Sequence, residues 1–576
     1  MEELKYSEII KKNAVLAESV ADCPVYDITV LSNITCHQLG EILSFNLRSH
    51  GLNPRLTLGN YDNIVQDSYH CSGAKMVIIH YDLVAILDKY ADYAENLAEN
   101  QIAVLTETIH TEIDLMLSNL SSVPVVVFDT FLAEGVYSHA FQFSATCLIA
   151  ENLNMYLRSR KQSNLQIIDI HTTLMRVGFD NVFDWRMYYL SKSLYSVAFW
   201  KEYSFELSSL VYKYTGKLKK AIIFDCDNTL WKGILGEDGE NGIDMSVHSK
   251  IGQIYHRVQQ IAVWLSNHGV LIGLCSKNND SDVEKILLGH SDMKLRKDHI
   301  VVSRVNWKDK ASNLKEIAEE LNIGLDSLIF VDDSPFEINL IREQLPMVLA
   351  FQVPAALHLY PAELLKIVDR YMYLSGNSED IRKTEQYKAQ QEREKAKNEY
   401  SSLEDYLASL EIGIEIEKDN VFQIERIAQL TQKTNQFNLT TKRYTEAQIE
   451  AFMQSKDWEV YAVTVADKFG DSGLTAVCIV KNESGQVGID TFLMSCRIMG
   501  RNIEKVILDY LVLRYKKQEI SSIKATYIPT QKNKPVCDFY ENSGFRVLDV
   551  ENGVKSYELV LAEYTPSDIE YIKIKN

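Results

Sequence analysis

The chain of 576 residues contains only 10 prolines, which leaves little room for long disordered linkers. Its nine cysteines are scattered, odd in number and never spaced as Cys-x-x-Cys, so neither a disulfide framework nor a zinc site is indicated. No apolar run reaches membrane-spanning length, and residues 1–5 lack the layout of a signal peptide. Free cysteines favour a reducing compartment, and we expect a cytoplasmic protein with no membrane partner.

Positive charge is also scarce. Lys and Arg number 60 against 79 Asp and Glu, which gives a net charge of −19 and excludes a general nucleic-acid binder. Local lysines with Mg²⁺ could still bind a small phosphate. A hydrophobic share of 46% with 24% charged residues is typical of globular protein, and the length predicts roughly three to four domains.

Residues 1–215 alternate short β-rich runs with longer helical stretches. The runs cover residues 26–31, 55–60, 75–81, 123–129 and 166–170. This alternation predicts a parallel, doubly wound sheet. The first run ends at Ser32 and the second at Gly59, an order that resembles the SGNH-hydrolase domain.

That family needs an Asp-x-x-His near the domain end to deprotonate its serine. Asp184-Trp185-Arg186-Met187 has Met where the His should be, and Asp169-Ile170-His171 has the wrong spacing. Without its base, Ser32 is a poor nucleophile at neutral pH. We therefore expect a non-hydrolytic scaffold or partner-docking domain over residues 1–215.

Residues 216–375 carry the most informative stretch, Ala221-Ile222-Ile223-Phe224-Asp225-Cys226-Asp227-Asn228-Thr229-Leu230. Its apolar half predicts a buried strand, and two carboxylates one residue apart follow at the strand end. Open α/β sheets place their chemistry at this position. Because the two carboxylates repel each other, a cation or a proton is needed to hold both.

Three later segments add polar groups at matching positions. A buried run at residues 270–275 ends in Ser276-Lys277-Asn278, at a helix start that suits phosphate. Asn306-Trp307-Lys308-Asp309-Lys310 precedes a helix, and either lysine could balance a phosphate. A run at residues 327–331 ends in Asp332-Asp333-Ser334-Pro335, which fits a metal site.

The order Asp-x-Asp-x-Thr, Ser, Lys and Asp-Asp resembles the haloacid dehalogenase (HAD) superfamily of phosphotransferases. The resemblance implies that Asp225 is the nucleophile and Asp227 the general acid/base. It implies that Ser276 and Lys310 hold the phosphoryl oxygens, with Thr229 and Asn278 beside them. Mg²⁺ would be bound by Asp225, by the carbonyl of Asp227 and by Asp332, with Asp333 supporting it.

The match narrows to subfamily IIIC of that superfamily. Its marks are the run from Asp225 to Trp231, Gly236-Glu237-Asp238-Gly239, Asn306-Trp307 with Lys310, and Phe330-Val331-Asp332-Asp333-Ser334-Pro335-Phe336-Glu337. No large cap insertion is present between the first two motifs. Such a minimal cap predicts an open site that admits a phosphate on a large carrier as well as a free metabolite.

The remainder of the chain has two parts. Residues 376–410 are highly charged and are predicted to form a solvated connecting helix, and residues 411–576 form a further domain. In the latter, strands at 460–465 and 474–480 flank a predicted hairpin turn at 469–473, after a polar loop at 430–441. A strand at 491–496 precedes Arg497-Ile498-Met499-Gly500-Arg501-Asn502, a helix to Tyr510 and a strand at 523–527.

This order resembles the GNAT acyltransferase fold, in which the turn after the strand binds the coenzyme A pyrophosphate at a helix start. Asn502 stands where that family usually has Gly or Ala. We therefore expect a GNAT-like α+β fold without acetyl transfer. Arg497 and Gly500, with Cys496 beside them, form a candidate turn for an acyl group or for carrier-protein phosphopantetheine.

The whole layout resembles the FkbH-like family. Supporting marks are Asp225 to Trp231, Thr434-Asn435-Gln436-Phe437-Asn438-Leu439 and Phe492-Leu493-Met494-Ser495-Cys496-Arg497. The resemblance implies a glyceryltransferase/phosphatase that takes 1,3-bisphosphoglycerate and loads D-glyceryl on a protein thiol. It then removes the remaining phosphate and delivers the glyceryl unit to an acyl carrier protein for polyketide, tetronate or related pathways.

The sequence does not decide which of two cysteines carries the acyl group. Cys226 lies between the two catalytic aspartates, whose charge should raise the pKa of the thiol, and strand alternation also allows it to be a small buried hydrophobe. Cys496 at the GNAT-like turn is the alternative. Two other functions remain open: a simple phosphatase of a small phosphorylated metabolite, and a non-catalytic platform that docks a carrier protein.

Overall fold

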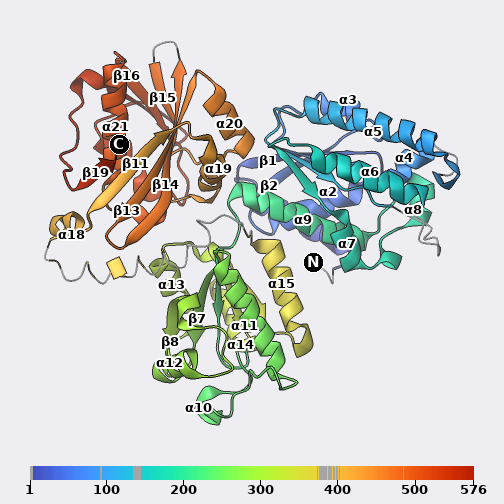
Figure 1. Ribbon diagram of the computed structural model, residues 1–576, viewed down its shortest axis with the longest axis horizontal. Coiled ribbons are helices and arrows are strands. Elements are labelled where there is room, and N and C mark those ends of the chain that lie inside the picture. Colours follow the sequence, from blue (N-terminus) through green and yellow to red (C-terminus); the bar gives the residue numbers. More distant parts are fainter. Residues whose placement is uncertain are drawn as a thin grey trace. The chain divides into compact units, whose positions relative to one another are not determined.

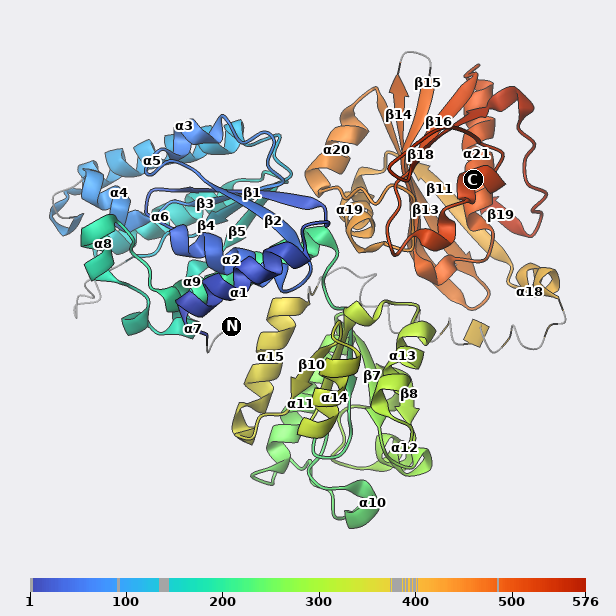
Figure 2. The same cartoon turned by 180° about the vertical axis from the view of Figure 1, so that it is seen from behind.

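The computed structural model describes residues 4–90, 94–133, 144–372, 402–483 and 486–575, and within 373–401 residues 374, 386, 389, 392, 393, 396 and 400. The chain divides into two units, Met1–Val211 with Tyr444–Gln448, and Tyr212–Arg443 with Ile449–Asn576. Figures 1 and 2 show the chain from opposite sides. Most of the predicted connecting helix at 376–410 lies outside the described residues. None of the described helices has the length and apolarity needed to cross a membrane.

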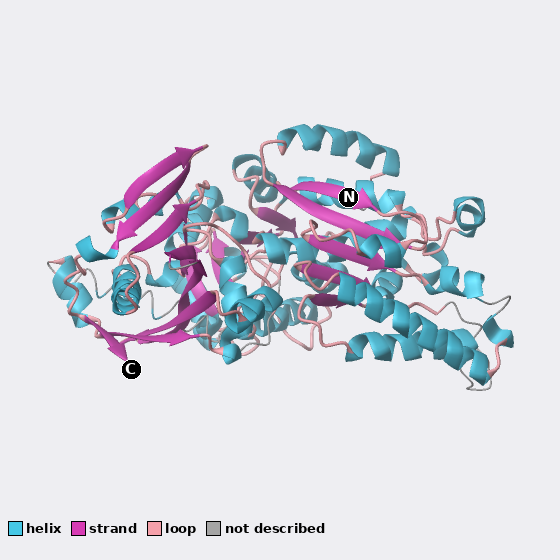
Figure 3. Cartoon of the chain, turned by 90° about the horizontal axis from the view of Figure 1, so that it is seen from above, coloured by secondary structure: helices cyan, strands magenta, loops and turns pink. Residues whose placement is uncertain are grey.

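The first unit contains a five-stranded, fully parallel sheet in the order β2-β1-β3-β4-β5, as the sequence predicted. Its strands are β1 (Val25–Ser32), β2 (Asn53–Leu58), β3 (Met76–His80), β4 (Val125–Asp129) and β5 (Leu165–Ile168). Its helices are α1 (Tyr6–Ser19), α2 (His37–Arg48), α3 (Ile64–Ser68), α4 (Leu83–Tyr90), α5 (Glu99–Asn119), α6 (Ala145–Ser159), α7 (Ile170–Val177), α8 (Trp185–Ser191) and α9 (Val197–Thr215). In Figure 3 these strands lie between layers of helices, as expected for a doubly wound sheet.

The second unit begins with another parallel sheet, in the order β10-β9-β6-β7-β8. Its strands are β6 (Ala221–Phe224), β7 (Leu271–Ser276), β8 (Ile300–Val305), β9 (Leu328–Asp332) and β10 (Leu349–Gln352). The helices are α10 (Leu235–Asp238), α11 (Gly252–Asn267), α12 (Asp280–Gly289), α13 (Lys310–Glu320), α14 (Pro335–Gln344) and α15 (Tyr360–Tyr371). One apolar core packs the sheet against α11 and α15, and a second packs the other face against α13 and α14.

Strand β6 lies at the centre of this sheet, and all four of its residues are fully buried and apolar. A strand covered on both faces reads as a continuous hydrophobic run, which is the pattern at residues 221–224. The segment after β6 contains only the four-residue helix α10 before α11 begins at Gly252. The minimal cap predicted from the sequence therefore corresponds to a short, largely irregular segment.

The rest of the second unit is a mixed sheet in the order β17-β18-β16-β15-β14-β13-β11-β19, with β12 paired to β15. Its strands are β11 (Ile412–Lys418), β12 (Phe437–Asn438), β13 (Trp458–Asp467), β14 (Gly470–Glu483), β15 (Gln486–Met494), β16 (Ser522–Tyr527), β17 (Arg546–Glu551), β18 (Val554–Val560) and β19 (Ile572–Lys575). Its helices are α18 (Leu403–Ser409), α19 (Ile424–Lys433), α20 (Glu446–Gln454), α21 (Ile503–Lys517) and α22 (Phe539–Asn542). The predicted order of hairpin, strand, turn, helix and strand is confirmed.

Two local predictions in this region were wrong. The predicted hairpin turn at 469–473 is shorter, because β13 extends to Asp467 and β14 starts at Gly470. The predicted polar loop at 430–441 contains the last turn of α19 and the short strand β12. Its polar side chains are buried by tertiary packing, which composition alone does not reveal.

Candidate active site

Three polar residues meet at one edge of the parallel sheet. Asp225 directly follows β6, Ser276 is the last residue of β7, and Asp332 is the last residue of β9. Because β9, β6 and β7 are adjacent and parallel, their carboxyl ends lie side by side. The backbone N–H of Asp225 donates to the carbonyl of Val331 (2.9 Å), which continues the pairing of β6 with β9 up to the aspartate.

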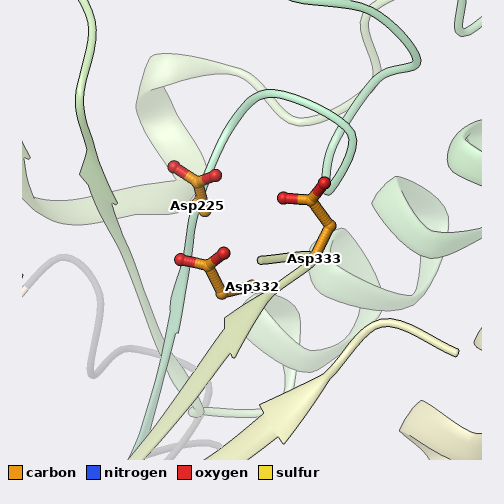
Figure 4. Close-up of side chains that lie close together, drawn as sticks. All are labelled: Asp225, Asp332 and Asp333. Atoms are coloured by element: carbon orange, nitrogen blue, oxygen red, sulfur yellow. The ribbon is translucent and has the colours of Figure 1, made fainter. Parts of the chain in front are cut away.

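Asp225, Asp332 and Asp333 form an acidic cluster. Each offers a carboxylate oxygen, and the three oxygens lie within 4.8 Å of one another. Figure 4 shows the three carboxylates facing a common space, one from the end of β6 and two from the end of β9. Asp225 and Asp332 are buried, and Asp333 is partly exposed.

Lys310 supplies the positive charge at this cluster. It is the first residue of α13, and the side chain of the preceding Asp309 caps that helix by accepting from the N–H of Ser312. The Lys310 Nζ lies 2.6 Å from Asp332 Oδ2 and 3.1 Å from Asp225 Oδ1, and its side chain is only 5% exposed. Of the two lysines that the sequence offered, Lys310 is therefore the one at the cluster.

One lysine does not neutralise three carboxylates. Burial raises the pKa of Asp225 to about 6, and Asp332 adds to the rise although Lys310 opposes it. Burial also raises the pKa of Asp332 and of Asp333. Burial disfavours the charge of Lys310, but Asp225 and Asp332 outweigh it and raise the pKa of the ammonium. The cluster thus carries excess negative charge that a divalent cation would offset.

The donor set fits Mg²⁺. All three candidate ligands are carboxylates, the hard oxygen donors that Mg²⁺ prefers. Asp225 Oδ1 is buried, and none of the described residues gives it an aligned hydrogen bond. The side chain of Asp227 is not part of the cluster, so its carbonyl remains the predicted fourth ligand.

The carboxylate of Asp227 is fixed by its neighbours. Its Oδ1 accepts from the indole N–H of Trp231 (3.0 Å) and from the backbone N–H of Leu235 (3.0 Å). Its Oδ2 accepts from the side-chain amide of Asn278 (2.9 Å), which also donates to Ser276 Oγ (3.2 Å). Asn278 thus links the two strand ends, and it orients the residue predicted as the general acid/base.

Thr229 and Ser276 are both buried. Thr229 Oγ1 has no hydrogen-bond partner among the described residues, and its backbone carbonyl accepts from the hydroxyl of Tyr360 (3.3 Å). Ser276 is held by Asn278, and its hydroxyl also favours the ionised form of Asp225. Ser276 therefore lies at the cluster, where a phosphoryl-binding group is needed, while Thr229 is enclosed.

Cys226 is fully buried in the apolar core on the α11 and α15 face of the sheet. Burial raises the pKa of its thiol well above the usual value, and the charge of Asp225 raises it further. A thiol in this state is a weak nucleophile. The structure thus favours the packing role for Cys226 over the acyl-carrying one.

Two features of the site were not predicted from the sequence. Trp231 belongs to the recognised motif but had no assigned role, and its donation to Asp227 follows from the four-residue spacing across the turn. Lys277 pairs with the buried Glu337 (2.7 Å), linking the segment after β7 to α14. Only the three-dimensional fold brings Lys277 and Glu337 together, because 60 residues separate them.

In the first unit, Ser32 is paired in register with His80, and His80 is adjacent in the sheet to Asp129. The Nδ1 of His80 lies 2.5 Å from Asp129 Oδ2, but His80 Nε2 has no hydrogen-bond partner in the part of the chain that the structure describes, and the residue is 1% exposed. The hydroxyl of Ser32 accepts from the N–H of Ile34 (3.1 Å). These groups form a buried polar core, and the non-hydrolytic role of this domain stays a prediction.

The residues of the GNAT-like turn lie after β15. Cys496 is partly buried, and the Arg497 Nε donates to Ser495 Oγ (3.2 Å). Gly500 adopts a φ of 76° and Asn502 a φ of 62°, so the turn passes twice through the left-handed region before α21 begins. Asn tolerates that conformation better than most residues, which explains its presence in place of Gly.

Among solved structures, the chain is similar to the N-terminal part of a Bacteroides fragilis protein. That crystal structure contains a phosphatase domain and is complexed with Mg. It matches with a TM-score of 0.57 and 23% identity, covering 65% of this chain and 100% of that chain. The ribosomal-protein-S18-alanine N-acetyltransferase from Escherichia coli matches with a TM-score of 0.21 and 10% identity, covering 27% of this chain and 97% of the enzyme. The first likeness shows the fold, and the second score is too low to support an argument.

A GNAT domain from S. lividans matches with a TM-score of 0.22 and 14% identity, covering 25% of this chain and 89% of that domain. No protein-family model and no curated protein matches the chain.

Mg²⁺ is expected to raise the thermal midpoint of the chain, because it would bind a folded cluster that carries excess negative charge. In Asp333→Asn, the Mg²⁺ concentration that gives half of this rise should increase about 10- to 100-fold. Thermal unfolding at a series of Mg²⁺ concentrations measures it. Asp298→Asn, at an exposed position just before β8 and away from the acidic cluster, is the control. An equal response in both variants would exclude Asp333 from the site.

Proposed function

We propose that the chain is a Mg²⁺-dependent phosphatase of the HAD type, with Asp225 as nucleophile. The observation that carries the proposal is the bridge of Lys310 between Asp225 and Asp332, beside Asp333, at the carboxyl edge of the sheet. This set combines a nucleophile, a buried cation and a carboxylate metal site. The solved phosphatase domain with Mg, similar in fold, supports the same reading.

The reaction would proceed in two displacements. A carboxylate oxygen of Asp225 attacks phosphorus and forms an aspartyl-phosphate, while the bond from phosphorus to the ester oxygen breaks. Asp227, held by Trp231 and Asn278, protonates the leaving alkoxide. It then accepts a proton from a water that attacks phosphorus, which breaks the bond from phosphorus to the Asp225 oxygen, releases phosphate and restores the carboxylate. Lys310 and Ser276 hold the phosphoryl oxygens, and bound Mg²⁺ would supply charge neutralisation there.

The finer proposal follows the FkbH-like resemblance. The chain would accept D-glyceryl from 1,3-bisphosphoglycerate on a cysteine, remove the 3-phosphate and pass the glyceryl unit to an acyl carrier protein. An acyl phosphate is activated toward a thiolate, which attacks the carbonyl carbon and releases phosphate. Cys496 supports this role better than Cys226, because its thiol is partly exposed whereas that of Cys226 is buried with a raised pKa.

Intact-protein mass spectrometry with 1,3-bisphosphoglycerate and Mg²⁺ tests both the phosphatase and the glyceryl transfer. We expect one glyceryl adduct on the parent chain and on Cys226→Ser, and none on Cys496→Ser. Loss of the adduct only in Cys226→Ser would assign the acyl-carrying role to Cys226. Phosphate release without any adduct or carrier loading would leave the simple phosphatase. Neither activity, together with tight carrier binding, would favour the docking platform.

A further inference from the structure

A cavity of about 390 Å³ lies within the second unit, away from the acidic cluster. One wall consists of residues that precede the parallel strands: Lys220 before β6, Val270 before β7 and Ser327 before β9. Asp225 and Asp332 follow the same strands. The cavity therefore opens at the amino edge of the sheet, opposite the candidate active site at its carboxyl edge.

The second wall comes from the mixed-sheet region. It includes α19, the segment just after it, the turn after β15 and the segment after β16. Direct contacts join the two walls. The Lys220 Nζ donates to the carbonyl of Lys433 (3.3 Å), and the Asn322 side chain donates to the carbonyl of Cys496 (3.2 Å).

The charge of the lining is strongly one-sided. Seven lining residues are cationic and none is Asp or Glu, in a chain whose net charge is −19. The cationic residues are Lys213, Lys219, Lys220, Arg426, Lys433, Arg497 and Lys532. Asp326 lies next to the lining and pairs with Lys532 (2.5 Å). This local concentration of positive charge in an acidic protein favours the binding of an anion.

Burial disfavours the charged form of two of these lysines. Burial lowers the pKa of Lys219 to about 8; Asp326 opposes this fall, and Lys217 and Lys532 add to it. Burial also lowers the pKa of Lys220, with Lys532 and Arg443 contributing. The opposite charge of a bound anion would offset both the repulsion among the cations and the cost of their burial. Lys220 and Cys496 line the same cavity.

The lining also offers an unused donor. The Nη1 of Arg497 is buried and has no hydrogen-bond partner among the described residues, while Nε of the same side chain donates to Ser495. An unsatisfied guanidinium N–H beside ammonium groups suits a phosphate, which accepts several hydrogen bonds at once. Leu218, Met372 and Leu430 add apolar surface for an organic portion.

We propose that this cavity binds a small organic phosphate at a site separate from Asp225. Its volume lies within the range of about 300–1,000 Å³ that is usual for small-molecule sites. The inference rests on the cavity, its charge and Arg497, and does not depend on the proposed phosphatase activity. Cys496 lies in the lining, so its reactivity reports occupancy of the cavity directly.

The test uses the full chain without Mg²⁺ and with inorganic pyrophosphate as the probe. Alkylation of Cys496 by iodoacetamide is followed peptide by peptide in a mass spectrometer, with the partly exposed Cys537 as internal control. Pyrophosphate is expected to slow alkylation of Cys496 at least about fivefold and to leave Cys537 unchanged. Sodium chloride at equal ionic strength should not protect.

Arg497→Gln and Lys220→Gln are expected to raise the pyrophosphate concentration that gives half protection about tenfold or more, since each removes a charged hydrogen-bond donor. Lys250→Gln, at an exposed lysine outside the cavity, should behave like the parent chain. Thermal midpoints establish that the variants fold, and Arg497→Gln decides the outcome if Lys220→Gln does not. Equal protection in Arg497→Gln and the parent chain, or none in either, would overturn the proposal.

Discussion

The Asp225→Asn variant is expected to release phosphate from a phosphate ester at least about 1,000-fold more slowly than the parent chain. An amide is not a nucleophile at phosphorus, so the first displacement is lost. The side chain keeps its shape, and the variant removes a buried carboxylate whose pKa is raised to about 6. We therefore expect the metal-free variant to be at least as stable as the parent. Phosphate release with p-nitrophenyl phosphate and Mg²⁺, together with thermal unfolding, measures both effects.

Asp298→Asn, an exposed aspartate in the same region, should leave the rate within about twofold of the parent. An unchanged rate in Asp225→Asn would remove Asp225 from the nucleophile role. A lower rate with a strongly lowered thermal midpoint would instead assign Asp225 a structural role.

Lys310→Met is expected to show the largest combined loss of activity and stability. The substitution leaves Asp225 and Asp332 buried without the ammonium that contacts both, at 3.1 Å and 2.6 Å. Removing one partner of a buried ion pair costs about 3–5 kcal/mol of unfolding free energy. Phosphate release should fall at least about 100-fold, because a cation on the transferring phosphoryl oxygens is lost. Denaturant unfolding without Mg²⁺ and rate measurement with Mg²⁺ separate the two losses.

Lys308→Met is the matched control, because Lys308 lies two residues earlier and pairs with Glu316 at a largely exposed position. Exposed pairs contribute at most about 1 kcal/mol, so we expect little change in stability or rate. If Lys308→Met lost activity as Lys310→Met does, the assignment of the buried lysine would be wrong.

The parallel sheets were predictable because their signals are local. Residues 221–224 and 328–331 are short apolar runs, each followed directly by aspartate, and buried parallel strands read in this way. Strands β8 and β10 were not predicted. Strand β8 has exposed or partly exposed residues near its end, and β10 has one fully buried residue among four. Such edge strands lack the hydrophobic contrast on which the prediction depends.

The meeting of Asp225 and Asp332 was predictable because the carboxyl ends of parallel strands lie at one edge of a sheet. The order of the strands in the sheet was not needed for that step. Lys310, at the start of α13, was distinguished from Lys308 only by the family resemblance. The support of Asp227 by Asn278 required the fold, since 51 residues separate the two. The burial of Cys226 likewise depends on which face of the sheet α11 and α15 cover.

The cationic cavity could not be predicted from the sequence. Lys220, Arg426 and Arg497 are scattered over nearly 300 residues, and the sequence predicted a binding role only for Arg497, in the GNAT-like turn. Only the three-dimensional arrangement gathers them around one space. Desolvation of Lys219 and Lys220 is also invisible in the sequence, because it depends on what packs over them.

The most direct test of the central claim is the search for a phosphoryl group on Asp225. The parent chain is mixed with Mg²⁺ and p-nitrophenyl phosphate, quenched in acid during turnover and digested for mass spectrometry. We predict that the peptide containing Asp225 carries one phosphoryl group, at Asp225, and that the Asp225→Asn chain carries none. Phosphate release with the phosphoryl group on another residue, such as Ser276, or with no phosphorylated peptide at all, would contradict the account.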